Sequence, residues 1–151
     1  MIPTLDRPTT TERIAFDTNA IIYFVEGVSP YREWLTPMFA SIERGERLAV
    51  VSVVTEMEAL VKPLVTSDLD ALRRMKEFFS GGNIEVHELT RDLARASARV
   101  SADLNLDLPD AVVVATAVAT KCDALVGNDS AFRKRLRDIP YIYLEDAVRK
   151  R

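Results

Sequence analysis

Short apolar segments alternate with longer amphipathic segments along the chain, and this alternation restricts the fold more than any other sequence feature. One short segment, residues 48–54, is apolar and β-branched apart from Ser52, as in a strand covered on both faces of a parallel sheet. Strands that alternate with helices of about 10–15 residues indicate βαβ crossovers. The pattern predicts one α/β domain over residues 13–151 with a mainly parallel sheet, after a flexible lead of residues 1–12.

The individual elements are expected from apolar periodicity and from capping residues. Strands are expected at residues 14–16, 48–54, 84–89, 124–126 and 141–144. Helices are expected at residues 20–25, 30–44, 55–63, 67–79, 91–104, 108–121 and 130–136, followed by a basic tail helix. Pro37 predicts a kink or a split in the second helix, and Ser67 is expected to cap the fourth.

The composition excludes several classes of protein. The 151 residues are 48% hydrophobic and 28% charged, which is typical of a folded domain and not of a disordered chain. The single cysteine, Cys122, and the single histidine, His87, exclude an internal disulfide, a structural zinc site and a two-histidine ribonuclease mechanism. We interpret Cys122 as a small buried residue and His87 as a strand-surface side chain. The longest apolar stretch, residues 111–119, is too short to span a bilayer, which predicts a soluble protein, and the single cysteine is consistent with a reducing, cytoplasmic compartment.

Four acidic residues stand where an apolar stretch gives way to turn residues: Asp17, Glu56, Asp110 and Asp129. Open parallel sheets bind ligands beyond the carboxyl ends of their strands, which places Asp17 and Asp129 at that edge. Two carboxylates about 4 Å apart repel by roughly 4 kcal/mol at an effective dielectric near 20, so such a cluster favours a bound divalent cation. The four acids therefore predict a metal-dependent hydrolytic site.

Each acid also has a simpler interpretation. Asp17 and Asp129 are able to cap the helices that follow them, and Asp110 suits the first turn of a helix capped by Asp107. Glu56 lies on an apparent apolar stripe through Val53, Met57, Leu60, Val61 and Leu64, where an unpaired carboxylate is costly. Glu58 suits a solvent-exposed pair with Lys62 or a capping box with Thr55, so Glu56 is the expected site residue.

The segments around these acids are similar to those of a known family. FDTNAII, VVTEMEAL, LPDAVVVATA and LVGNDSAF, within about residues 13–146, resemble a PIN domain, particularly the VapC-type ribonuclease toxin of toxin–antitoxin pairs. The resemblance implies a three-layer α/β/α sandwich and RNA cleavage with Mg²⁺ or Mn²⁺ held by Asp17, Glu56, Asp110 and Asp129. It also implies that Asn19 helps to order the site. Gly127 departs from the pattern, because the family usually has Thr or Ser there, and a supporting hydroxyl is expected to be missing.

The resemblance further implies partners. A homodimer surface and a groove for a helical protein antitoxin are expected near Trp34 and Phe78–Phe79. The formal net charge of −3 does not indicate nucleic-acid binding, although a bound cation would offset the acids. Arg133, Lys134 and Arg135 follow Asp129 and are candidates for RNA backbone contacts, with an ordinary solvated face as the alternative.

Two rival functions remain open at this point. One is a PIN-like RNA-binding module with a degenerate, weakly active or inactive site. The other is an aspartyl phosphotransferase, in which the Asp after the first strand is a nucleophile. That class usually has a second Asp two residues later, where this chain has Asn19.

Overall fold

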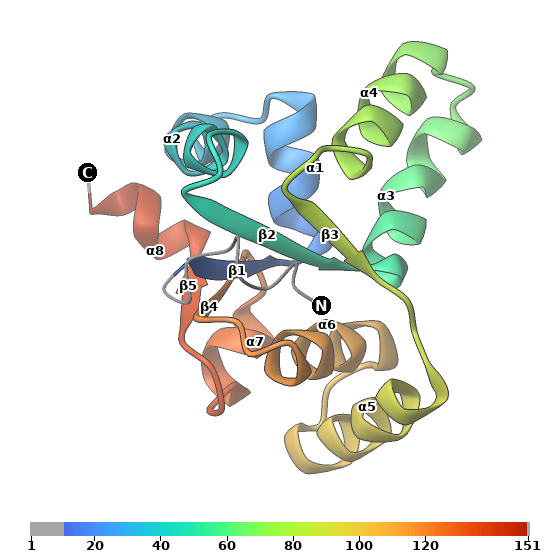
Figure 1. The fold of residues 1–151 in the computed structure, drawn as a ribbon, viewed down its shortest axis with the longest axis vertical. Coiled ribbons are helices and arrows are strands. Elements are labelled where there is room, and N and C mark those ends of the chain that lie inside the picture. The colour runs from blue at the N-terminus through green and yellow to red at the C-terminus, as the bar shows by residue number, and fades with distance from the viewer. Residues whose placement is uncertain (1–10, 151) are drawn as a thin grey trace, which may run out of the picture.

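Five parallel strands form one sheet at the centre of the molecule (Figure 1). The structure is a computed structural model that describes residues 11–150. The strand order is β3-β2-β1-β4-β5, and each neighbouring pair is parallel. The strands are β1 (Glu12–Phe16), β2 (Arg47–Ser52), β3 (Ile84–His87), β4 (Ala124–Gly127) and β5 (Tyr141–Tyr143). The predicted α/β class with a parallel sheet is confirmed.

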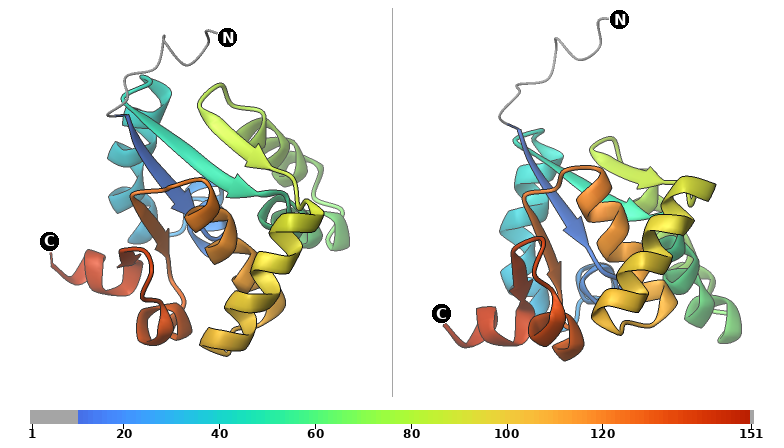
Figure 2. Two further views of the ribbon diagram at one scale, coloured as in Figure 1. Left: turned by 60° about the horizontal axis from the view of Figure 1, so that its bottom comes forward. Right: turned by 90° about the horizontal axis from the view of Figure 1, so that it is seen from below.

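Helices cover both faces of this sheet, which gives the expected three layers (Figures 1 and 2). The helices are α1 (Thr18–Glu26), α2 (Tyr31–Glu43), α3 (Val53–Val65), α4 (Leu69–Phe79), α5 (Arg91–Leu104), α6 (Leu108–Ala119), α7 (Ser130–Arg135) and α8 (Leu144–Arg149). One layer holds α1 to α4 and α8, and the opposite layer holds α5, α6 and α7. In the part of the chain that the structure describes, no helix is both long and apolar enough to cross a bilayer.

The alternation of side chains along β1 divides the interior into two cores. Ile14 and Phe16 belong to the core under α1–α4, where the Phe16 ring stacks on Phe39 at 4.7 Å between centroids. Ala15 points to the other core, with Val114 of α6 and Phe132 of α7. Successive strand residues face opposite sides of a sheet, so β1 anchors both layers.

The structure corrects several predicted boundaries. β2 ends at Ser52 and not at residue 54, because the Ser52 hydroxyl accepts the Val54 N–H at 3.0 Å and starts α3 there. Asp68, not Ser67, caps α4: its carboxylate accepts the Ala71 N–H at 3.0 Å. α2 continues through Pro37 as one helix.

The predicted lead of residues 1–12 falls mostly outside the described residues. Glu12 is an exception, since it opens β1 in register with Arg47 of β2. The ordered sheet therefore begins one residue before the predicted domain start.

The carboxyl ends of β1, β2 and β4 meet at one edge of the sheet, because the strands are parallel. The backbone N–H of Asp17, just after β1, donates to the carbonyl of Val126 in β4 at 3.0 Å. Asp17, after β1, and Asp129, after β4, lie at this edge.

Candidate active site

Asp17 is a buried carboxylate between the end of β1 and the start of α1. Its side chain is 5% exposed; Oδ1 accepts the Ala20 N–H at 3.0 Å and Oδ2 accepts the Asn128 N–H at 3.3 Å. The pKa of Asp17 is raised to about 7, mainly by burial and also by the nearby charges of Asp129 and Asp110, against the lowering effect of these two hydrogen bonds. Asp17 is thus a helix cap and at the same time an acid that is costly to ionise.

Asp110 lies in the first turn of α6, where the buried helix approaches the same edge. The pKa of Asp110 is raised to about 6, mainly by burial. The charges of Asp129, Glu58 and Asp107 and a hydrogen bond with the Asp129 side chain also contribute to this rise. Residues 111–117 of α6 are all buried, so this helix cannot carry Asp110 away from the sheet. Asp107 is the N-cap residue, as expected, although its side chain makes no capping bond.

Asp129 follows β4 and caps α7. Its Oδ1 accepts the Ala131 N–H at 2.7 Å, and its own N–H donates to the Tyr141 hydroxyl at 2.9 Å. Because Asp129 raises the pKa of both Asp17 and Asp110, the three aspartates form one electrostatic unit. The sequence prediction that they gather at one edge agrees with this geometry.

The acid of α3 that approaches the aspartates is Glu58, and not the expected Glu56. The hydroxyl of Thr18, next to Asp17, donates to Oε1 of Glu58 at 2.7 Å, and the Glu58 charge acts on Asp110. Glu56 is partly buried and makes no hydrogen bond or ion pair within residues 11–150. Side chains two positions apart in a helix point in directions that differ by about 200°, so Glu56 does not lie on the same face of α3 as Glu58. The structure therefore links Glu58, and not Glu56, to the aspartates.

The prediction of Glu56 depended on the expected start of the helix and on the apparent apolar stripe. The exposed fractions of Met57 and Val61 are 59% and 52%, whereas the buried face carries Thr55, Ala59 and Pro63. Of the stripe that selected Glu56, Met57, Val61 and Leu64 therefore face outward, whereas Leu60 packs against the core. The alternatives offered for Glu58 also fail: no Lys62 ion pair is present among the described residues, and the buried Thr55 hydroxyl has no hydrogen-bond partner there.

Asn128, and not the expected Asn19, contacts Asp17 among the described residues. Asn19 is exposed and its side chain makes no hydrogen bond with any other described residue. Asn128 instead donates its backbone N–H to Asp17, while its side chain donates to the Tyr23 hydroxyl at 3.2 Å and accepts the Glu145 N–H at 3.0 Å. Its position between the end of β4 and Asp129 was the available sequence signal.

The predicted RNA-contacting residues lie in the last turn of α7 and are exposed. Arg133 pairs with Asp146 at 2.9 Å and lies over the Tyr143 ring at 5.3 Å. Arg135 donates to the Asn105 carbonyl at 2.6 Å. Lys134 makes no contact of this kind with the rest of the described chain, which leaves its ammonium group to solvent.

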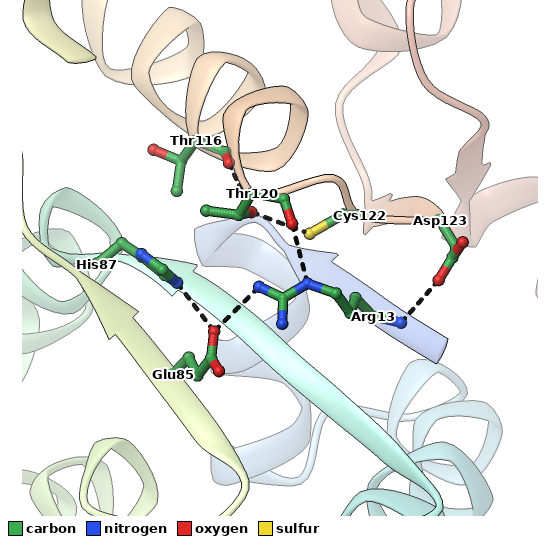
Figure 3. Close-up of polar contacts among 7 residues, drawn as sticks. All are labelled: Arg13, Glu85, His87, Thr116, Thr120, Cys122 and Asp123. Atoms are coloured by element: carbon green, nitrogen blue, oxygen red, sulfur yellow. Dashed lines mark hydrogen bonds and ion pairs between the residues drawn. The ribbon is translucent and has the colours of Figure 1, made fainter. Parts of the chain in front are cut away.

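A second polar cluster, shown in Figure 3, has a structural explanation. Arg13 of β1 donates to Glu85 of β3 at 3.0 Å and to the Thr120 carbonyl at 2.9 Å, and His87 lies 3.0 Å from the same Glu85 oxygen. Burial raises the pKa of the half-buried Cys122 thiol, which disfavours a nucleophilic thiolate. His87 is the predicted strand-surface side chain, and Cys122 is only partly buried.

The family assignment rests on a match along most of this framework. The PIN domain family model matches residues 14–136, from β1 past α7, and so includes Asp17, Glu58, Asp110 and Asp129. The chain belongs to the PIN domain family. No curated protein matches it.

Solved structures similar to this PIN domain share its fold. VapBC2 from Rickettsia felis bound to a promoter DNA fragment is 15% identical, with a TM-score of 0.65 over 87% of this chain and 98% of that one. A toxin–antitoxin complex from Klebsiella pneumoniae is 23% identical, with a TM-score of 0.65 over 87% and 97%. PAE2754 from Pyrobaculum aerophilum is 20% identical, with a TM-score of 0.60 over 93% and 96%.

The donor set of this PIN domain fits a hard divalent cation. PIN domain nucleases generally use divalent metal ions, and the edge offers carboxylate oxygens, which suit Mg²⁺ or Mn²⁺ better than zinc. Burial and mutual repulsion raise the pKa values of Asp17 and Asp110, and a cation would offset both effects. Among residues 11–150, however, no three acidic, histidine or cysteine side chains are arranged to hold an ion as they stand. Binding therefore requires a side-chain adjustment or bridging water.

Proposed function

We propose that this PIN domain is an Mg²⁺- or Mn²⁺-dependent endoribonuclease that hydrolyses RNA phosphodiester bonds, and that it is the toxin of a toxin–antitoxin pair. The observation that carries the proposal is the coupling of three acids at one sheet edge: burial and the charge of Asp129 raise the pKa values of both Asp17 and Asp110. A site of this kind is a frequent marker of function.

Each side chain of the site has a separate task. Asp17, Asp110 and Asp129 would hold the cation, with Glu58 direct or through water. The N–H groups of Ala20 and Asn128 fix the orientation of Asp17, and the Thr18 hydroxyl fixes Glu58. A bound cation supplies charge stabilisation at the scissile phosphate and lowers the pKa of a bound water. Lys134, with Arg133 and Arg135, would hold the RNA backbone beside α7.

Partners are proposed from the fold and from exposed apolar surface. Several structures of similar fold are complexes of a toxin with an antitoxin. In this chain, an apolar hollow lies between α1, α2 and α4, lined in part by Phe24, Phe39 and Phe78. We propose that this hollow receives a protein antitoxin and that the chain forms a homodimer in the cytoplasm.

The proposal is tested with purified protein and 5′-labelled structured RNAs, incubated with Mg²⁺, with Mn²⁺ or with a chelator. Cleavage is expected only with metal and is expected to be lost in Asp17→Asn. Asp103→Asn, an exposed acid on α5, is the matched control. Cleavage that survives the chelator or the Asp17 substitution would reject the metal site.

A PIN-like RNA-binding module is the second candidate, because no three ligands are already arranged for an ion within residues 11–150. That function predicts RNA binding in gel-shift experiments without cleavage under any metal. Cleavage and gel-shift experiments on the same purified protein therefore distinguish the nuclease from the RNA-binding module.

A further inference from the structure

Gly127, at the end of β4, leaves a space that two other residues fill. A Cβ atom on Gly127 would lie 2.0 Å from Oδ2 of Asp17 and 2.8 Å from the Tyr141 hydroxyl oxygen. Gly127 is not among the residues with positive φ, so its backbone does not demand glycine. Glycine is required here by the closeness of Asp17 and Tyr141.

Tyr141 is held firmly in that position. It opens β5 in register with Leu125 of β4, its ring packs edge-on against Phe132 at 5.5 Å between centroids, and it stacks on Tyr143 at 6.3 Å. Its hydroxyl accepts the Asp129 N–H at 2.9 Å. The hydroxyl of Tyr141 thus lies between the loop that carries Asp129 and the carboxylate of Asp17.

The Tyr141 hydroxyl can both donate and accept a hydrogen bond. Its oxygen is already an acceptor for Asp129, and its proton makes no hydrogen bond within the described residues. A protonated phenol beside two acids is a donor for a carboxylate or for a water held between them.

We propose that Tyr141 is a positioning residue of the active site, whose hydroxyl fills the place left open by Gly127 and fixes Asp17 relative to Asp129. The PIN family usually has a Thr or Ser hydroxyl at the position of Gly127. The Tyr141 hydroxyl, from the neighbouring strand β5, then takes its place. This inference rests on the proposed nuclease function for its activity and metal readouts, but not for the order of the Asp129 loop.

Tyr141→Phe removes the hydroxyl and keeps the ring. Loss of a group that orients metal ligands typically costs about 10- to 100-fold in activity or metal affinity. We expect kcat for RNA cleavage to fall within that range with KM unchanged, and Mn²⁺ affinity measured by calorimetry to weaken. We also expect the Asp129 amide proton to exchange faster in NMR, since it loses its acceptor.

Tyr143→Phe is the matched control, because Tyr143 lies two residues along β5 and its hydroxyl makes no hydrogen bond within residues 11–150. It is expected to match the wild type in all three measurements. Gly127→Ala provides an independent variant: its methyl group displaces Asp17 and should also weaken Mn²⁺ binding. Combined with Tyr141→Phe, its effect should be less than the product of the single losses, since both disturb the same carboxylate.

The outcomes separate the two proposals. If the wild type cleaves RNA and binds Mn²⁺ but Tyr141→Phe does so equally well, the role of Tyr141 is refuted and the nuclease stands. If the wild type neither cleaves nor binds, the nuclease fails and Asp129 amide exchange alone decides the inference. Unchanged exchange in Tyr141→Phe then overturns it, and faster exchange supports it. Should Tyr141→Phe fail to fold, the Mn²⁺ affinity of folded Gly127→Ala decides, and wild-type affinity overturns the proposal.

Discussion

A 2.7 Å hydrogen bond from the Thr18 hydroxyl to Glu58 joins the first turn of α1 to α3, and Thr18 directly follows Asp17 in the chain. Glu58 also acts on Asp110 of α6 through its charge. The bond therefore connects a helix outside the aspartate cluster to the cluster itself. It makes Glu58 the residue by which α3 contributes to the site.

Glu58→Gln is expected to lower RNA cleavage strongly, whereas Glu56→Gln is expected to leave it unchanged. Removing the Glu58 charge weakens the cation site by about 10- to 100-fold, while a surface change away from the site alters the free energy by less than about 0.5 kcal/mol. Initial rates across a Mg²⁺ titration that includes concentrations below saturation measure both variants. The opposite order of effects would restore Glu56 to the site.

Thr18→Val tests whether the hydroxyl positions Glu58. The side chain keeps its size and loses one hydrogen bond, which is worth about 0.5–1.5 kcal/mol. We expect Mn²⁺ affinity, measured by calorimetry, to fall by a few-fold, and no further loss when Thr18→Val is added to Glu58→Gln. Thr36→Val is the control, because Thr36 donates a similar 2.7 Å bond to the Arg32 carbonyl on exposed α2. An additive loss in the double variant would show that Thr18 acts independently of Glu58.

The sheet and the aspartates were predictable because they follow from local patterns. The apolar β-branched segments and their spacing predict parallel strands, and parallel strands bring Asp17 and Asp129 to one edge. Glu58 was not predictable in the same way, since the choice between it and Glu56 depends on which side of α3 packs inward. That choice requires the true helix start at Val53, two residues before the predicted one.

Tyr141 lay beyond sequence reasoning for a different reason. Nothing in the segment of residues 141–144 distinguishes a strand tyrosine that packs in a core from one that delivers a hydroxyl to a site. Only the register of β5 with β4 places it beside Gly127 and Asp17. Long-range register is set by tertiary packing, so local patterns do not contain this information.

The metal-free protein is expected to lose stability as the pH rises from about 4 to 7. The folded-state pKa values of Asp17 and Asp110 are raised to about 7 and about 6, so the folded protein holds these protons more tightly than the unfolded chain. Their contribution is fully present below the unfolded pKa, near 4, and is lost as the pH passes the folded values. The loss is on the order of a few kcal/mol for buried Asp17 and is smaller for half-exposed Asp110 because solvent screens it.

Urea unfolding in chelator at pH 4 and pH 8 measures this loss, and Mg²⁺ is expected to recover it at pH 8. Asp110→Asn should be more stable than the wild type at pH 8 in chelator and equal to it at pH 4, because the amide does not ionise. Asp103→Asn should not differ from the wild type at either pH. A metal-free protein that gains stability between pH 4 and 7 would contradict the raised pKa values.

The outward stripe of α3 predicts an interface between copies of the chain. Met57, Val61, Leu64 and Val65 are exposed by 59%, 52%, 60% and 77%, an apolar surface that isolated soluble domains rarely leave open. Val61→Glu with Val65→Lys should convert a dimer of twice 16.9 kDa to a monomer in light scattering. Stability of the separated chain should change by less than about 0.5 kcal/mol, because neither side chain is buried within it. Leu89→Lys, at a 40% exposed leucine between β3 and α5, is the control and should remain dimeric. A wild type that is monomeric at micromolar concentration would refute the homodimer and leave this stripe to another protein.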